Sequence, residues 1–125
     1  MARLEAQTVL VVDEDLELLD RLVVFIRALG YIAVPAASIE NAEVILEKLH
    51  IDLVLLDLAP DAAPGALITR LKAEQPDVYV VVGAEPHQIR AVLAAGGDEA
   101  IATPLAAEHL EAVVRRVLPL PVVRR

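Results

Sequence analysis

Short apolar runs alternate along the chain with longer segments in which apolar residues recur every three or four positions. The runs are rich in Val, Leu and Ile at successive positions, which is typical of strands buried on both faces. They cover residues 8–12, 32–36, 53–56, 78–82 and 100–102. The sequence therefore predicts five short, buried strands.

The segments between these runs have the period of amphipathic helices. The first begins after Asp15, which suits a helix N-cap, and stops at Gly30, which can take the left-handed conformation after a last turn. The second begins after Ser38, another capping residue, and keeps its apolar face as far as Leu49. Three further helices are predicted over residues 66–74, 88–95 and 108–118. Pro119 cannot continue the last of them.

Strands that alternate with amphipathic helices predict a parallel sheet covered by helices on both faces. Five such units in 125 residues make one doubly wound α/β domain, because this length is close to that of a typical single domain. In this architecture ligands bind beyond the carboxyl ends of the strands. Polar residues that directly follow a strand are therefore the candidate functional residues.

Composition and charge exclude several classes of protein. A hydrophobic content of 57% excludes a disordered chain. A formal net charge of −8, with only one Phe and two Tyr, argues against direct nucleic-acid binding. No stretch approaches the roughly 18 apolar residues of a membrane-spanning helix. The absence of Cys fits a reducing compartment, and we therefore expect a cytoplasmic protein.

Carboxylates follow the first and the third predicted strands. Asp13 and Glu14 come directly after the first strand, and Asp57 comes directly after the third. If both strands are central and parallel, the three carboxylates converge, and their repulsion favours a bound divalent cation or a retained proton. Magnesium suits such a site because it prefers oxygen ligands. The alternative reading of the residues is a set of solvated loop carboxylates that cap the following helices.

Three motifs in this order resemble the receiver domain of bacterial response regulators. They are VLVVDEDLELL from Val9, DLVLLDL from Asp52 and AGGDE from Ala95. The resemblance covers residues 8–118 and implies the flavodoxin-like (βα)5 fold of CheY-like domains. We therefore expect a receiver domain over residues 1–118, followed over residues 119–125 by a tail or the start of a linker.

The resemblance also implies a phosphorylation site. Asp57 matches the aspartate that accepts a phosphoryl group from a histidine kinase in that family. Asp13 and Glu14 match the acids that hold Mg²⁺, and the backbone carbonyl of Ala59 matches the remaining protein ligand. The metal would neutralise the phosphoryl oxygens while Asp57 attacks, as is usual in phosphoryl transfer.

Three positions depart from the family pattern. Gly83 stands where the family has the Thr or Ser that bonds a phosphoryl oxygen, and Thr103 stands where it has a Lys. Ala100 replaces an aromatic residue that swings inward on activation. Pro104 matches a proline whose preceding peptide bond is commonly cis. Without the Lys and the hydroxyl, two contacts that favour the phosphorylated state are missing. A phosphoryl group would therefore form few interactions that could shift the conformational equilibrium.

We therefore expect a degenerate receiver, or pseudo-receiver, that is not an enzyme and works through constitutive protein contacts. The alternative is a working phosphoacceptor that a histidine kinase phosphorylates on Asp57. A third reading, from a different class, is a small phosphatase with an aspartyl-phosphate intermediate. Such enzymes place a second aspartate two residues after the nucleophile, and this chain has Ala59 there.

The expected partners are proteins, namely a histidine kinase or an output or regulatory domain. In the family, the last two helices and the strand between them form the face used for dimers and output partners. The same segment of this chain is rich in Ala and Val, which suits a low-profile protein interface and a homodimer through these helices. We expect neither nucleic acid nor a membrane as a partner of this domain.

Overall fold

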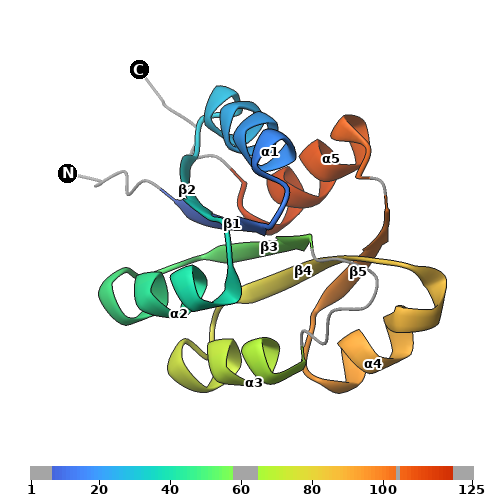
Figure 1. Cartoon of the computed structure of the whole chain (residues 1–125). Helices are drawn as coiled ribbons and strands as arrows, with labels where there is room; N and C mark the ends of the chain where they lie inside the picture. The colour runs from blue at the N-terminus through green and yellow to red at the C-terminus, as the bar shows by residue number, and fades with distance from the viewer. Residues whose placement is uncertain (1–6, 58–64, 104, 120–125) are drawn as a thin grey trace.

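The computed structural model describes residues 7–57, 65–103 and 105–119, and within them five parallel strands alternate with five α-helices (Figure 1). The strands are β1 (Thr8–Asp13), β2 (Ile32–Ala36), β3 (Leu53–Asp57), β4 (Tyr79–Ala84) and β5 (Glu99–Ala102). The helices are α1 (Leu16–Ala28), α2 (Ile39–Lys48), α3 (Gly65–Glu74), α4 (Ile89–Ala94) and α5 (Ala107–Val117), with a 3₁₀ helix, η1 (Pro86–Gln88), before α4. The predicted doubly wound α/β fold is confirmed.

The strands lie in the order β2-β1-β3-β4-β5. Strands β1 and β3 are neighbours at the point where this order reverses, which is where ligands bind in open α/β sheets. Their register places Asp13 opposite Asp57, and the register of β3 with β4 places Asp57 opposite Gly83. Three of the expected site positions therefore lie side by side at the carboxyl ends of three neighbouring strands.

Two layers of helices bury the sheet. Helices α1 and α5 cover one face, and α2, α3 and α4 cover the other (Figure 1). Strands β1 and β3 contribute apolar side chains alternately to both hydrophobic clusters, because successive side chains of a strand point to opposite faces. This explains why these strands are continuous apolar runs in the sequence.

The predicted helix boundaries at α1 and α2 have the expected hydrogen bonds. The Asp15 carboxylate accepts from the N–H groups of Glu17 and Leu18 at 3.1 and 3.2 Å. The Ser38 hydroxyl accepts from the N–H of Asn41 at 3.1 Å, and Gly30 has a φ of 105° after the last turn of α1. Within the described ranges, no helix has the length and apolar character needed to cross a membrane.

Two predicted boundaries differ from the structure near β4. The strand was expected over residues 78–82 and lies at Tyr79–Ala84, because pairing with β5 extends it through Gly83 and Ala84. The helix expected over residues 88–95 is the shorter α4, preceded by η1. Pro86 fixes its own φ and has no N–H, and it begins this tighter turn.

A buried hydrogen bond ties the end of the last helix to the opposite edge of the sheet. The Tyr31 hydroxyl, just before β2, donates to the carbonyl of Leu118 at 2.6 Å. Tyr31 is 4% exposed and Leu118 is 7% exposed, so neither group can exchange this bond for water without local opening. The bond therefore fixes the position of the end of α5.

We expect Tyr31→Phe to lower the free energy of unfolding by about 1 to 2 kcal/mol, because it leaves the buried Leu118 carbonyl without its donor while keeping the ring in place. Urea unfolding followed by circular dichroism measures this change. Tyr79→Phe is a suitable control, since the Tyr79 hydroxyl donates to the partly exposed Glu99 carboxylate. An effect of Tyr31→Phe no larger than that of Tyr79→Phe would contradict the assigned role.

Candidate functional site

The candidate site is built on two carboxylates at the carboxyl ends of the two central strands. Asp13 closes β1 and Asp57 closes β3, and they face each other in the register of the parallel pair. Asp13 is 4% exposed and is the one buried polar or charged side chain within residues 7–57, 65–103 and 105–119. Asp57 is half-buried. Two acidic groups are thus held together in a poorly solvated place.

The two oxygens of Asp13 have different surroundings. Oδ1 accepts the N–H of Asp15 at 2.9 Å, which fixes the side-chain orientation. Oδ2 is buried and has no hydrogen-bond partner in the structure. A buried oxygen without a donor is unfavourable, because it has lost water without replacement. This oxygen is therefore the atom that a proton or a cation would satisfy.

The surroundings disfavour ionisation of both carboxyls. The pKa of Asp13 is raised from 3.8 to about 6. Burial is the main cause, the hydrogen bond from the Asp15 N–H opposes it, and the charge of Asp57 adds to it. Burial also raises the pKa of Asp57; its contact with the Asp13 carboxyl lowers that pKa, and the charge of Asp15 raises it. Both groups are therefore more readily protonated than free aspartates.

Glu14 and Asp15 do not join this pair as ligands of a common centre. Glu14 is exposed, and Asp15 uses its carboxylate to cap α1. Across the described ranges, no three His, Cys, Asp or Glu side chains are placed to hold one metal ion. The structure thus brings together two of the three carboxylates that were expected to converge. Ala59 and Pro104 lie outside the described residues.

The Asp13–Asp57 pair nevertheless fits the chemistry of a hard divalent cation. Mg²⁺ prefers oxygen ligands, keeps several waters and usually takes only one or two carboxylates from a protein. The unpartnered Oδ2 of Asp13 is such an oxygen, and it lies beside a second carboxylate. A cation here would also relieve the repulsion that raises the two pKa values.

Little space is free beside Asp57 on the β4 side, where Gly83 lies. A Cβ at Gly83 would lie 3.1 Å from Oδ1 of Asp57, 3.3 Å from the methyl carbon of Thr103 and 3.4 Å from Cδ2 of Leu105. These separations are tight, so a larger residue at this position needs its neighbours to shift. Two methyl groups therefore approach the place that a Thr or Ser side chain would occupy.

Thr103 directs its polar atom away from Asp57. Its hydroxyl donates to the carboxylate of Glu85 at 3.1 Å. Glu85 also caps η1 in a capping box with Gln88, and its N–H donates to the Gln88 side chain at 2.9 Å. The end of β5 is thus bonded to the turn after β4 by a contact that leaves Asp57 out. Ala100, on β5, is partly buried against the cluster beneath α2, α3 and α4.

Two residues of this site were not singled out in the sequence. Glu85 follows β4, and the pattern of the chain gave no reason to pair it with Thr103. Leu105 is an apolar residue in a loop, and only the three-dimensional structure brings it close to Gly83. The positions of Asp13 and Asp57 could be predicted because each directly follows a recognisable strand, and those of Gly83 and Thr103 because they match positions of the receiver family.

The raised pKa of Asp13 makes stability depend on pH. The folded state holds this proton more tightly than the unfolded chain, so the resulting stabilisation is complete below pH 3.8 and is lost as the pH rises through about 6. Asp13→Asn keeps an oxygen for the Asp15 N–H and removes the charge. Without divalent cations we expect this variant to be more stable than wild type at about pH 8, by on the order of 1 to 2 kcal/mol.

The advantage of Asp13→Asn should shrink towards about pH 5, where the wild-type carboxyl is protonated. Chemical denaturation at both pH values in the presence of a chelator measures it. Asp77→Asn, at an exposed position in the turn before β4, controls for general charge effects. A variant that is less stable than wild type at the higher pH would show that the pair is not repulsive.

The model of the response regulator receiver domain matches residues 9–115. Comparison of the sequence with curated proteins found no match.

Solved structures with the same fold include a two-component response regulator from Clostridium difficile, which is 25% identical with a TM-score of 0.81, covering 90% of this chain and 95% of that one. A CheY-like receiver domain protein from Methanospirillum hungatei JF-1 is 22% identical with a TM-score of 0.80, covering 90% and 94%. An orphan response regulator of H. pylori is 20% identical with a TM-score of 0.81, covering 93% and 99%.

Proposed function

Because the chain belongs to the response regulator receiver domain family of two-component signalling, we propose that it is an atypical receiver that signals through constitutive contacts with other proteins. In this proposal phosphorylation of Asp57 is weak or does not change the conformation. The observation that carries the proposal is the environment of Asp57. On the β4 side, Asp57 has beside it Gly83 and the methyl groups of Thr103 and Leu105. The Thr103 hydroxyl is hydrogen-bonded to Glu85.

A phosphoryl group on Asp57 would find few groups to bind on this side. A Lys at position 103 would supply a charge-assisted hydrogen bond, and a hydroxyl at position 83 would supply another; this chain has neither. A ligand shifts a conformational equilibrium only by its difference in affinity for the two states. With these contacts missing, a phosphoryl group on Asp57 provides little of that difference.

The acidic pair supports retention of a magnesium site. Asp13 and Asp57 would hold the ion, and the family resemblance adds the Ala59 carbonyl as a further ligand. Glu14, which the resemblance also implies, is exposed and does not join the pair. When bound, the ion would neutralise negative charge on phosphoryl oxygens. In this chain the pair itself would gain from a bound ion, because the buried Oδ2 of Asp13 would obtain a partner and its repulsion with Asp57 would be screened.

We expect Mg²⁺ to stabilise the wild-type protein at about pH 8, by about 1.4 kcal/mol at a concentration ten times its dissociation constant. Asp13→Asn should lose most of this gain, since it removes a charged ligand. Thermal unfolding over a magnesium titration measures both, and Asp52→Asn, an acid at the start of β3 that bonds the Thr8 N–H, serves as a control. Equal magnesium stabilisation of wild type and Asp13→Asn would place the ion elsewhere.

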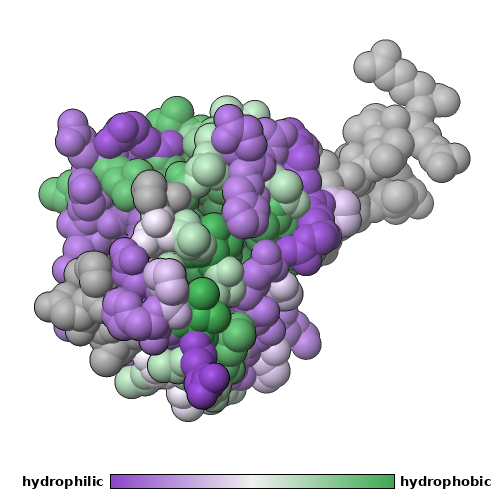
Figure 2. All heavy atoms as spheres, turned by 90° about the vertical axis from the view of Figure 1, so that its right-hand side faces the viewer, coloured by the Kyte–Doolittle hydropathy of each residue, from purple (hydrophilic) through white to green (hydrophobic). Residues whose placement is uncertain are grey.

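The face formed by α4, β5 and α5 is the docking surface in this proposal. Figure 2 shows this side of the molecule, where apolar side chains form a band between polar ones. Its exposed small or apolar residues include Ala91, Leu93, Ala94, Ala106 and Ala107. Such a low-profile apolar band suits a protein partner. We propose an output or regulatory domain or a second copy as that partner, in the cytoplasm.

A second candidate function, a working phosphoacceptor, is supported by the Asp13–Asp57 pair. Restoring the two missing groups tests between the functions. We expect Gly83→Ser/Thr103→Lys to be phosphorylated by acetyl phosphate and magnesium at least about tenfold faster than wild type, since each ~1.4 kcal/mol of transition-state stabilisation is tenfold in rate. Intact mass spectrometry follows the addition of one phosphoryl group.

Asp57→Ala in both backgrounds identifies the site of modification. Fast, stable phosphorylation of wild-type Asp57 would favour the working phosphoacceptor. A small aspartyl-phosphate phosphatase has no comparable support, because the residue two positions after Asp57 is Ala59. We therefore propose a binding module and not an enzyme.

A further inference from the structure

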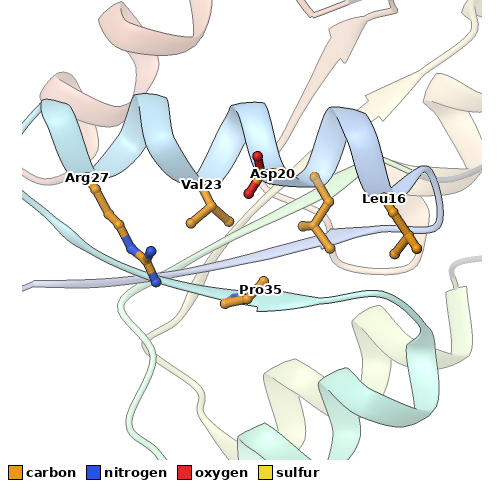
Figure 3. A pocket seen from close by; sticks show the side chains of 6 residues that line it. Leu16, Asp20, Val23, Arg27 and Pro35 are labelled. Carbon is orange, nitrogen blue, oxygen red and sulfur yellow. The ribbon is translucent and has the colours of Figure 1, made fainter.

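A second surface lies at the other edge of the sheet, where α1 crosses the edge strand β2. The two elements enclose a groove of about 220 Å³. Figure 3 shows Leu16, Val23 and Arg27 reaching from α1 towards β2, where Pro35 lies. The groove is lined by Leu16, Leu19, Asp20, Val23, Arg27 and Pro35. Its lining thus combines apolar side chains with an acidic group and a basic group.

The two charges lie on one face of the helix. Asp20 and Arg27 are seven residues apart, which is two turns and about 10.5 Å along the axis. Asp20 has no hydrogen bond or ion pair in the part of the chain that the structure describes. Arg27 donates one N–H to the Ala33 carbonyl at 3.0 Å and keeps further donors. Both charges can therefore be paired by a partner.

Exposed apolar side chains accompany these charges. Leu16 is 67% exposed and Val24 is 58% exposed, the two highest values among the exposed large hydrophobic residues of the described ranges. Both lie on α1 beside the charged pair, and Val24 follows Val23, which lines the groove. The exposed side chain of Val24 thus lies next to the groove.

The edge of β2 is not suited to pairing with another strand. The N–H of Ile32 bonds to Gln7 on the β1 side, so the alternate residues Ala33 and Pro35 direct their backbone groups outward. Pro35 has no N–H, and the Ala33 carbonyl already accepts from Arg27. Proline and a covering cation are common means of blocking a sheet edge. An extended peptide is therefore a poor occupant, and contact through the helix is favoured.

We propose that this surface binds a second copy of the same chain through antiparallel α1 helices. Rotation by 180° about an axis between Val23 and Val24 places Asp20 of each copy opposite Arg27 of the other. Val23 and Val24 lie on opposite flanks of the line from Asp20 to Arg27, so the same rotation places Val24 of each copy against Val24 of the other and sets the two grooves side by side. The two charges are therefore self-complementary, as a two-fold contact requires. A second copy of the chain has the two complementary charges at the required spacing, whereas a different protein would have them only by coincidence.

This contact is separate from the proposed function. The groove adjoins β2, and the docking face is formed around β5, at the opposite end of the strand order. A dimer through α1 leaves the α4, β5 and α5 face free for another partner. The two proposals therefore fail or succeed independently.

The test is sedimentation equilibrium of the full chain from about 10 µM to about 1 mM, the range expected for a small, weak interface. We expect a reversible monomer–dimer equilibrium. Asp20→Arg or Arg27→Glu alone should weaken dimerisation at least about tenfold, because each places like charges opposite each other. Asp20→Arg/Arg27→Glu should restore the dissociation constant to within about threefold of wild type.

Mixing the two single variants gives a sharper result. Asp20→Arg presents two cations and Arg27→Glu presents two anions, so an equimolar mixture should form a heterodimer although neither associates alone. Arg21→Glu reverses a charge on another side of α1 and should have little effect. Val24→Asp should also weaken dimerisation, because it places a carboxylate of each copy in the apolar contact, and circular dichroism checks the fold of each variant.

A monomer at all concentrations would overturn the proposal. So would a double variant no better than the single ones, because the charges would then not be reciprocal. If Leu93→Asp on α4 abolishes dimerisation and the α1 variants leave it intact, the copies associate through the α4, β5 and α5 face instead.

Discussion

The parallel pairing of β1 with β3 is the constraint on which the site depends. Both strands are buried on both faces, and their register ends with Asp13 opposite Asp57. Alternate side chains of both strands pack into the two hydrophobic clusters, and this packing on both faces holds the pairing in place. The burial of Asp13, its raised pKa and the unpartnered Oδ2 all follow. The fold thus creates a place for a proton or a cation before any ligand is considered.

What surrounds this pair decides how the domain can use it. Gly83 lies next to Asp57 in the sheet, but the nearby atoms above it are the methyl groups of Thr103 and Leu105. The Thr103 hydroxyl instead joins the end of β5 to Glu85 in the turn before α4. The segments that border the docking face are thus linked to each other without Asp57. An acidic pair that lacks a phosphoryl-binding partner fits a domain whose protein contacts do not depend on phosphorylation.

Much of this structure could be predicted from the sequence because local signals agree with the fold. The apolar runs gave the strands, and Asp15, Ser38 and Gly30 marked helix ends through their own backbone chemistry. Contacts between distant segments had no such signal. The extension of β4 depends on pairing with β5, and Glu85 and Leu105 reach the site only through the tertiary fold. Only the tertiary structure shows that the end of β1 buries the Asp13 carboxylate and leaves the Glu14 carboxylate exposed.

The most direct test of the account is the response of the magnesium-loaded, ¹⁵N-labelled domain to beryllofluoride, a stand-in for the phosphoryl group. The account predicts that amide shifts are confined to the surroundings of Asp13, Asp57 and Gly83, or are absent. Shifts that spread from Asp57 through Thr103 and Ala100 to α4 and α5 would contradict it, because they would show that the site still controls the docking face.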